Sequence, residues 1–150
     1  MTTVSSIRSA TRFRQTVLLI DDQSTVLDIH AAILKSLKMN LKIVAMTDPV
    51  EALAWLQNKQ VDLIITDFRM HQMDGMQFVQ ALKDADNTLT HTIVVVTVLK
   101  DKTTQQELIA AGASACLTKP VQTLELAKIV KNLLDQNKLY YDLNLIKRAN

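Results

Sequence analysis

Short apolar runs alternate with amphipathic stretches along most of the chain. The runs are rich in β-branched residues and end at polar or turn-forming residues, as buried strands do. They cover residues 16–20, 41–46, 61–67, 92–97 and 113–118. The stretches between them carry apolar residues three and four positions apart, which predicts helices with one buried face. The first such helix places Val26, Ile29 and Ile33 on one stripe.

Local signals mark where the helices begin. Ser24 and Asp101 are predicted N-caps, because their side-chain oxygens can accept hydrogen bonds from the free N–H groups of a first turn. The segment 48–51, Asp-Pro-Val-Glu, is a stronger start signal with a capping Asp and a proline at the first helical position. Strand and helix therefore alternate five times. This order predicts an α/β fold with a five-stranded parallel sheet and helices on both of its faces.

Length and composition indicate one globular domain. The chain has 150 residues, of which 48% are hydrophobic and 21% charged, and this is enough to build a core. We expect the domain to span residues 16–136, after a flexible N-terminal arm over residues 1–15 and before a C-terminal tail over residues 137–150.

Charge and cysteine content narrow the classes of function. A net charge of +2 is too small to favour nucleic acid as a partner. No apolar run approaches the length of a membrane span. The single cysteine, Cys116, excludes a disulfide within the chain and a multi-cysteine metal site, and it fits a reducing compartment. We therefore expect a cytoplasmic protein with neither a nucleic-acid nor a membrane partner.

Polar residues stand where the predicted strands end. Asp21 and Asp22 follow the first strand, Asp67 ends the third, Thr97 ends the fourth and Lys119 follows the fifth. In an open parallel sheet these ends meet at one edge, where ligands bind. Three carboxylates there repel one another unless a cation lies among them, and oxygen ligands suit Mg²⁺. Together with an ammonium group and a hydroxyl, the acids suit a phosphoryl group, and one carboxylate can act as the nucleophile.

Nucleotide-binding loops are missing from the sequence. The chain has only two glycines and contains neither a Walker A loop nor a Gly-x-Gly-x-x-Gly segment. The phosphoryl group is therefore expected to be attached to the protein itself.

Six short motifs occur in a fixed order. They are Val-Leu-Leu-Ile-Asp-Asp at 17–22, Asp-Leu-Ile-Ile-Thr-Asp-Phe-Arg-Met at 62–70, Met-Asp-Gly at 73–75, Val-Val-Val-Thr at 94–97, Ala-Gly-Ala at 111–113 and Leu-Thr-Lys-Pro at 117–120. In this order they resemble the receiver domains of two-component response regulators, similar to the chemotaxis regulator in size. The match covers roughly residues 15–136. The resemblance implies the flavodoxin-like, doubly wound form of the parallel fold.

The resemblance also implies roles for the residues at the strand ends. Asp67 is the implied phosphoacceptor, and Thr97 and Lys119 would contact the phosphoryl oxygens. The implied Mg²⁺ ligands are Asp22, Asp67 and the backbone carbonyl of Arg69, with Asp21 assisting. The bond before Pro120 is often cis in this family, which is a conformation that X–Pro bonds can adopt.

The implied function is a switch and not an enzyme. It would take its phosphoryl group from a histidine kinase or a phosphotransfer protein and signal to a downstream protein. One alternative is a pseudo-receiver that acts as a constitutive protein-docking module. A second is a haloacid-dehalogenase-like phosphatase, but that family requires Asp-x-Asp at its first strand, and Asp21-Asp22 does not supply it.

Three positions depart from the family pattern in ways that bear on the switch, and a fourth, His71, stands where a proline is common. Cys116 stands where an aromatic ring usually follows the movement of the switch threonine, and a cysteine is too small to replace it. Val98 replaces a normally small residue, which predicts narrower access to Asp67. Arg69 is a long cation two residues after the acceptor, placed to reach over the site or to remain in solvent.

The tail has an apolar pattern of its own. Leu139, Leu143 and Ile146 are spaced for one helical face, and such a face needs a partner to bury it. The tail is expected to extend the last helix, fold back on the domain, form a homodimer or lead into a linker.

Overall fold

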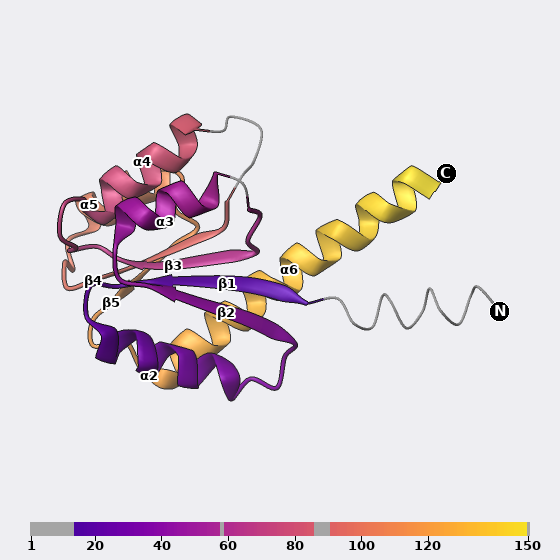
Figure 1. The fold of residues 1–150 in the computed structure, drawn as a ribbon, viewed down its shortest axis with the longest axis horizontal. Coiled ribbons are helices and arrows are strands. Elements are labelled where there is room, and N and C mark those ends of the chain that lie inside the picture. Colours follow the sequence, from indigo (N-terminus) through magenta and orange to yellow (C-terminus); the bar gives the residue numbers. More distant parts are fainter. Residues whose placement is uncertain (1–13, 58, 86–90, 150) are drawn as a thin grey trace.

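The fold is known from a computed structural model, which describes residues 14–57, 59–85 and 91–149, with side chains to residue 147. Five strands alternate with helices along the chain (Figure 1). In order, the elements are β1 (Gln15–Ile20), α2 (Ser24–Lys35), β2 (Leu41–Met46), α3 (Pro49–Leu56), β3 (Leu63–Asp67), α4 (Gly75–Ala85), β4 (Ile93–Thr97), α5 (Lys102–Ala111), β5 (Ala115–Thr118) and α6 (Thr123–Ala149). Most of the predicted arm, residues 1–13, lies outside the described residues.

All neighbouring strands of the sheet are parallel, in the order β2-β1-β3-β4-β5. The predicted five-stranded parallel sheet is therefore confirmed. The strand order reverses between β1 and β3, and side chains at the carboxyl ends of these two strands face a shared crevice. Asp21 follows β1 and Asp67 ends β3, so the topology brings the two acids to that crevice.

The sheet is covered on both faces, as the apolar runs predict. Helices α2 and α6 lie on one face, and α3, α4 and α5 lie on the other (Figure 1). Successive residues of a strand point to opposite faces. Leu63 and Ile65 therefore pack with the α2–α6 layer, while Ile64 between them packs with the layer that contains Phe78. All five residues of β3, including Asp67, are buried.

The structure corrects the predicted cap of α2. Ser24 is the first helical residue, and Gln23 is the N-cap without a side-chain hydrogen bond. The Oδ1 atom of Asp21 accepts a hydrogen bond from the Gln23 N–H instead, at 2.9 Å. The carboxylate before the helix therefore holds the N-cap residue, while the amides of Val26 and Leu27 donate to the Gln23 carbonyl. The predicted caps Asp48 and Asp101 are confirmed, since each accepts backbone N–H groups of its first turn.

Two strands are two residues shorter than predicted. β3 begins at Leu63 because the Asp62 carboxylate turns to the first strand and accepts the N–H of Thr16, at 2.7 Å. β5 begins at Ala115. Gly112, with φ 127°, ends α5, and the Ala113 N–H completes that end by donating to the carbonyl of Leu108.

Residues 137–149 continue helix α6 beyond the sheet. In Figure 1 this segment runs away from the body of the molecule, in the direction opposite to the strand ends that carry the acids. Leu139, Leu143 and Ile146 remain exposed. Of the four arrangements expected of the tail, the structure has the extension of the last helix, and the homodimer and the linker stay predictions.

Two side-chain amides fix α6 where it leaves the body. The Gln15 side chain donates to the carbonyl of Leu134 at 2.8 Å. The Asn137 side chain donates to the carbonyl of Asp62 at 2.6 Å and to the Thr92 hydroxyl at 3.2 Å. The last turns of the packed helix are thereby tied to β1 and to the residues that enter β3 and β4.

Replacing Asn137 with alanine should destabilise the fold. The substitution leaves the carbonyl of Asp62 without this donor, and losing such a partner costs about 1–3 kcal/mol. The measurement is the free energy of unfolding in urea. Lys138→Ala, at the next and exposed position, is the control and should change it by less than about 0.5 kcal/mol. Equal effects of the two substitutions would contradict this role of Asn137.

Candidate functional site

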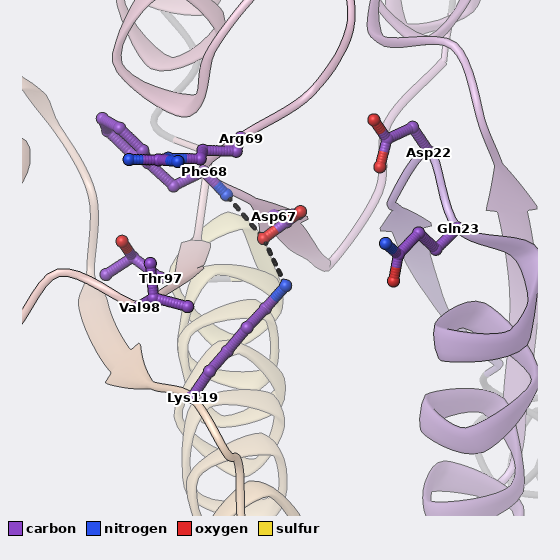
Figure 2. Close-up of a pocket in the computed structure, with 8 residues that line it drawn as sticks. All are labelled: Asp22, Gln23, Asp67, Phe68, Arg69, Thr97, Val98 and Lys119. Carbon is purple, nitrogen blue, oxygen red and sulfur yellow. Dashed lines mark hydrogen bonds and ion pairs between the residues drawn. The ribbon is translucent and has the colours of Figure 1, made fainter.

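A pocket of about 290 Å³ lies at the carboxyl ends of the strands. Its lining residues come from the segments after β1, β3, β4 and β5 (Figure 2). They are Asp22, Gln23, Asp67, Phe68, Arg69, Thr97, Val98 and Lys119. The structure thus brings together the polar strand ends that the sequence singles out, and a carboxylate oxygen of the buried Asp21 lies within 4.8 Å of those of Asp22 and Asp67.

Asp67 lies at the centre of this pocket and is 7% exposed. Its Oδ1 atom is 2.9 Å from Nζ of Lys119 and accepts the N–H of Phe68 at 3.0 Å. Figure 2 shows both contacts, and it shows the other carboxylate oxygen directed toward Asp22. One oxygen of Asp67 is therefore held by a cation and an amide, while the second faces the other acids.

Three carboxylates converge in the pocket. Asp21, Asp22 and Asp67 each offer an oxygen, and these oxygens lie within 4.8 Å of one another. Burial raises the pKa of Asp21 from 3.8 to about 6, and the charges of Asp67 and Asp22 act in the same direction. The Gln23 amide and Lys119 oppose this rise. The three carboxylates therefore repel one another. A hard divalent cation bound to their oxygens would relieve this repulsion.

The hydroxyl of Thr97 is not directed at Asp67. Its Oγ1 accepts the N–H of Leu99 at 3.0 Å, and in Figure 2 the hydroxyl points away from the carboxylate. Thr97 is only 1% exposed. To contact a group on Asp67, this side chain must give up its bond to the loop and rotate.

Gly75 holds the loop that follows Asp67 against the sheet. Its N–H donates to the carbonyl of Phe68 at 2.7 Å. A Cβ at this position would lie 3.0 Å from the Cα of Phe68 and 3.3 Å from the carbonyl oxygen of Asp67. A side chain at this position would have to push the backbone of Phe68 by a few tenths of an ångström, so the glycine lets α4 begin close to the acceptor strand.

Comparison with known proteins identifies the family. The profile of the response regulator receiver domain matches residues 17–131. The chain belongs to this family. It is a receiver domain homologous to response regulators of two-component systems, and the cluster of Asp21, Asp22 and Asp67 is consistent with a phosphorylation site.

Individual relatives agree with this assignment. The cyclic di-GMP phosphodiesterase response regulator RpfG of Xanthomonas campestris is 30% identical over 118 residues, which are 79% of this chain and 31% of that protein. Response regulator Rre1 of Synechocystis is 30% identical over 84% of this chain and 54% of its own length. The chain thus spans about a third to a half of these relatives. The solved structure of the chemotaxis response regulator CheY4 of Vibrio cholerae has a TM-score of 0.71 and 27% identity, over 81% of this chain and 99% of that one.

The three departures from the receiver pattern have distinct positions. Val98 is 53% exposed and lines the pocket beside Asp67. Arg69 is exposed, and its side chain extends away from Asp67 in Figure 2. Cys116 lies on the wall of a second pocket of about 540 Å³, formed with α5. Burial raises the pKa of its thiol, which keeps the sulfur protonated and unreactive.

His71 contacts one of the three acids, and the sequence marks it only as a departure from the proline that is common in the family. Its Nε2 lies 3.5 Å from Oδ2 of Asp22, and its side chain is almost fully exposed. The scattered histidines carry no spacing signal, and this contact joins the loop after β1 to the loop before α4, which are far apart in the sequence.

Two further expectations can be compared with the structure. The peptide bond between Lys119 and Pro120 is cis, as the family resemblance implies. In the described part of the chain, no helix has the length and apolar character needed to cross a membrane.

The metal-free receiver should lose stability as the pH rises from about 4 to about 6. The folded state holds the proton of Asp21 more tightly than the unfolded state does, because the folded pKa is raised. The stabilisation from this proton is complete below the unfolded pKa and is lost as the pH passes the folded one. Asp21→Asn keeps an oxygen for the Gln23 amide but does not ionise, so it should flatten the pH dependence.

The measurement is urea unfolding across this pH range without divalent ions. Asp28→Asn, an exposed substitution on α2, is the matched control and should keep the wild-type pH profile. An unchanged profile in Asp21→Asn would contradict the raised pKa.

Proposed function

We propose that this receiver is a phosphorylation-dependent switch in which Asp67 accepts a phosphoryl group from a histidine kinase or a phosphotransfer protein. The observation that carries the proposal is the asymmetric environment of Asp67. Lys119 and the Phe68 amide hold Oδ1, while the second oxygen faces the pocket and the other acids. A carboxylate held in this way presents one free oxygen as the nucleophile.

The transfer follows from this geometry. The free oxygen of Asp67 attacks phosphorus, the bond from phosphorus to the donor's imidazole nitrogen breaks, and that nitrogen keeps the electron pair. The product is an aspartyl phosphate. Lys119 lies close enough to Asp67 to neutralise charge on the transferred group. Mg²⁺, held by Asp22, Asp67 and the Arg69 carbonyl with help from Asp21, would supply further neutralisation of the phosphoryl oxygens.

The charge change at Asp67 supplies the signal. A phosphoryl group carries about −2 and adds strong acceptor oxygens. We propose that Thr97 then exchanges its bond to the Leu99 N–H for one to the phosphoryl group, which moves the loop before α5. The changed surface would comprise α5, β5 and α6, and a downstream protein in the cytoplasm would recognise it. Without a ring at Cys116, the expected coupling is about 1–2 kcal/mol, at the low end for allostery.

The pseudo-receiver alternative has no support in the site. Asp21, Asp22, Asp67, Thr97 and Lys119 are all present, and they lie around one pocket. Val98 and Arg69 leave the free oxygen of Asp67 open to the pocket in Figure 2.

Asp67→Asn should abolish phosphorylation. Incubation with acetyl phosphate and Mg²⁺ is expected to add one phosphoryl group to the wild-type chain, measured as a mass shift, and none to this variant. Asp28→Asn removes an exposed carboxylate outside the pocket and should be labelled like the wild type. Normal labelling of Asp67→Asn would refute the assignment of the acceptor.

Mg²⁺ binding should depend more on Asp22 than on Asp21. Asp22 lines the pocket, whereas Asp21 lies behind it with Oδ1 engaged by the Gln23 amide. Asp22→Asn is expected to weaken Mg²⁺ binding by about 100-fold, and Asp21→Asn by about tenfold, as is typical for a group that acts on the ligands. Calorimetric titration measures both affinities. Equal losses of Mg²⁺ affinity in the two variants would contradict a direct role for Asp22 and an indirect one for Asp21.

A further inference from the structure

The solvent-facing side of α6 changes from polar to apolar where the helix leaves the body. Along the packed part, the line of positions facing away from the sheet is polar, with Glu125, Lys128, Asn132 and Gln136. The same line continues into the tail as Leu139, Leu143 and Ile146, at the three- and four-residue spacing of one helical face. These side chains are 59%, 50% and 58% exposed. An apolar stripe therefore begins where the domain no longer offers a surface to cover it.

The opposite side of the tail is oriented toward the body. Tyr141 is on this side and is 40% exposed, less than any of Leu139, Tyr140, Leu143, Leu145 and Ile146. Burial and the nearby charge of Asp62 accordingly raise the pKa of its hydroxyl. The bonds of Asn137 hold the helix in this rotation. The stripe of Leu139, Leu143 and Ile146 lies about half a helical turn away from Tyr141, and so it is turned outward.

The tail of α6 exposes an apolar face that needs a partner. The segment from Asn137 to Ala149 projects about 20 Å at 1.5 Å per residue. The segment continues the packed part of α6 and needs no helix nucleus of its own, but most of the stability of a helix in a protein comes from packing of its apolar face. Three exposed apolar side chains on one face make an unpartnered state less favourable still.

We propose that the tail of α6 pairs with the tail of a second copy of this chain as a parallel two-stranded coiled coil. Leu139, Leu143 and Ile146 would form the seam, in the alternating three- and four-residue spacing of heptad core positions. This inference does not depend on phosphorylation of Asp67.

The charges beside the stripe select the partner and its direction. Asp142 flanks the seam on one side and Lys147 flanks it on the other. In a parallel pair, a residue on the first flank faces the residue five positions later on the other helix. Asp142 therefore faces Lys147 of the partner subunit, twice by symmetry. In an antiparallel pair with the same seam overlapped, Asp142 would face its own copy, and Lys147 would lie opposite Tyr140 with no acidic partner. The stripe is thus self-complementary only for a second copy in parallel register.

The pairing should be reversible, because the seam is short. We expect sedimentation equilibrium of the full chain to show a mass that rises with concentration from 16.8 kDa toward twice that value. Leu143→Lys places a charge in the seam and should leave a monomer at every concentration. Leu145→Lys makes the same change on an exposed residue outside the seam and should preserve the dimer.

Charge reversal tests the direction. Asp142→Lys alone and Lys147→Asp alone should each weaken the dimer several-fold, and the double variant should restore it. A wild-type chain that stays monomeric, or dimers that survive Leu143→Lys, would overturn the proposal. Weakening without rescue in the double variant would overturn the parallel register.

Discussion

Mutual repulsion of three carboxylates is the constraint on which the rest of this structure depends. Their oxygens lie within 4.8 Å of one another, and two like charges about 5 Å apart repel by about 3 kcal/mol at an effective dielectric constant of about 20. Lys119 compensates part of this charge through Asp67, and burial keeps Asp21 partly protonated near pH 6. The site is therefore held in a state that a divalent cation or a redistribution of charge would relax.

The fold prevents the acids from relaxing by moving apart. Asp67 ends a strand with every residue buried, and both faces of that strand pack against helices. Asp21 directly follows β1, which pairs with β3, and the Gln23 amide fixes its carboxylate. Gly75 seats the next loop tightly against Phe68. Because this edge of the sheet is rigid, the carboxylates stay close together and their repulsion favours binding of a cation. A flexible edge would let them move apart.

Much of this arrangement could be predicted from the sequence because it follows from periodicity. Alternating strands and helices determine a parallel sheet, and a parallel sheet gathers Asp21, Asp67 and Lys119 at one edge whatever the details of packing. The orientation of the Thr97 hydroxyl could not be predicted, since it depends on the backbone of the loop at Leu99. The Ser24 cap was wrong because the helix begins one residue earlier than predicted, with Gln23 as the N-cap and its amide held by the Asp21 carboxylate. The course of the tail depends on the Asn137 contacts, which join residues far apart in the sequence.

Helix α6 runs the length of the domain and continues beyond it as one uninterrupted rod of 27 residues, about 40 Å long. Its first turns follow the loop that carries Lys119, and its anchored middle meets the residues that enter β3 and β4. A pivot near Asn137 makes this rod a lever with one arm against the sheet and the other in solvent. The two arms have similar lengths, so a tilt of the packed arm would move the tail by a comparable distance, and the distance from a label on the tail to one on the body would report on the loop that carries Lys119.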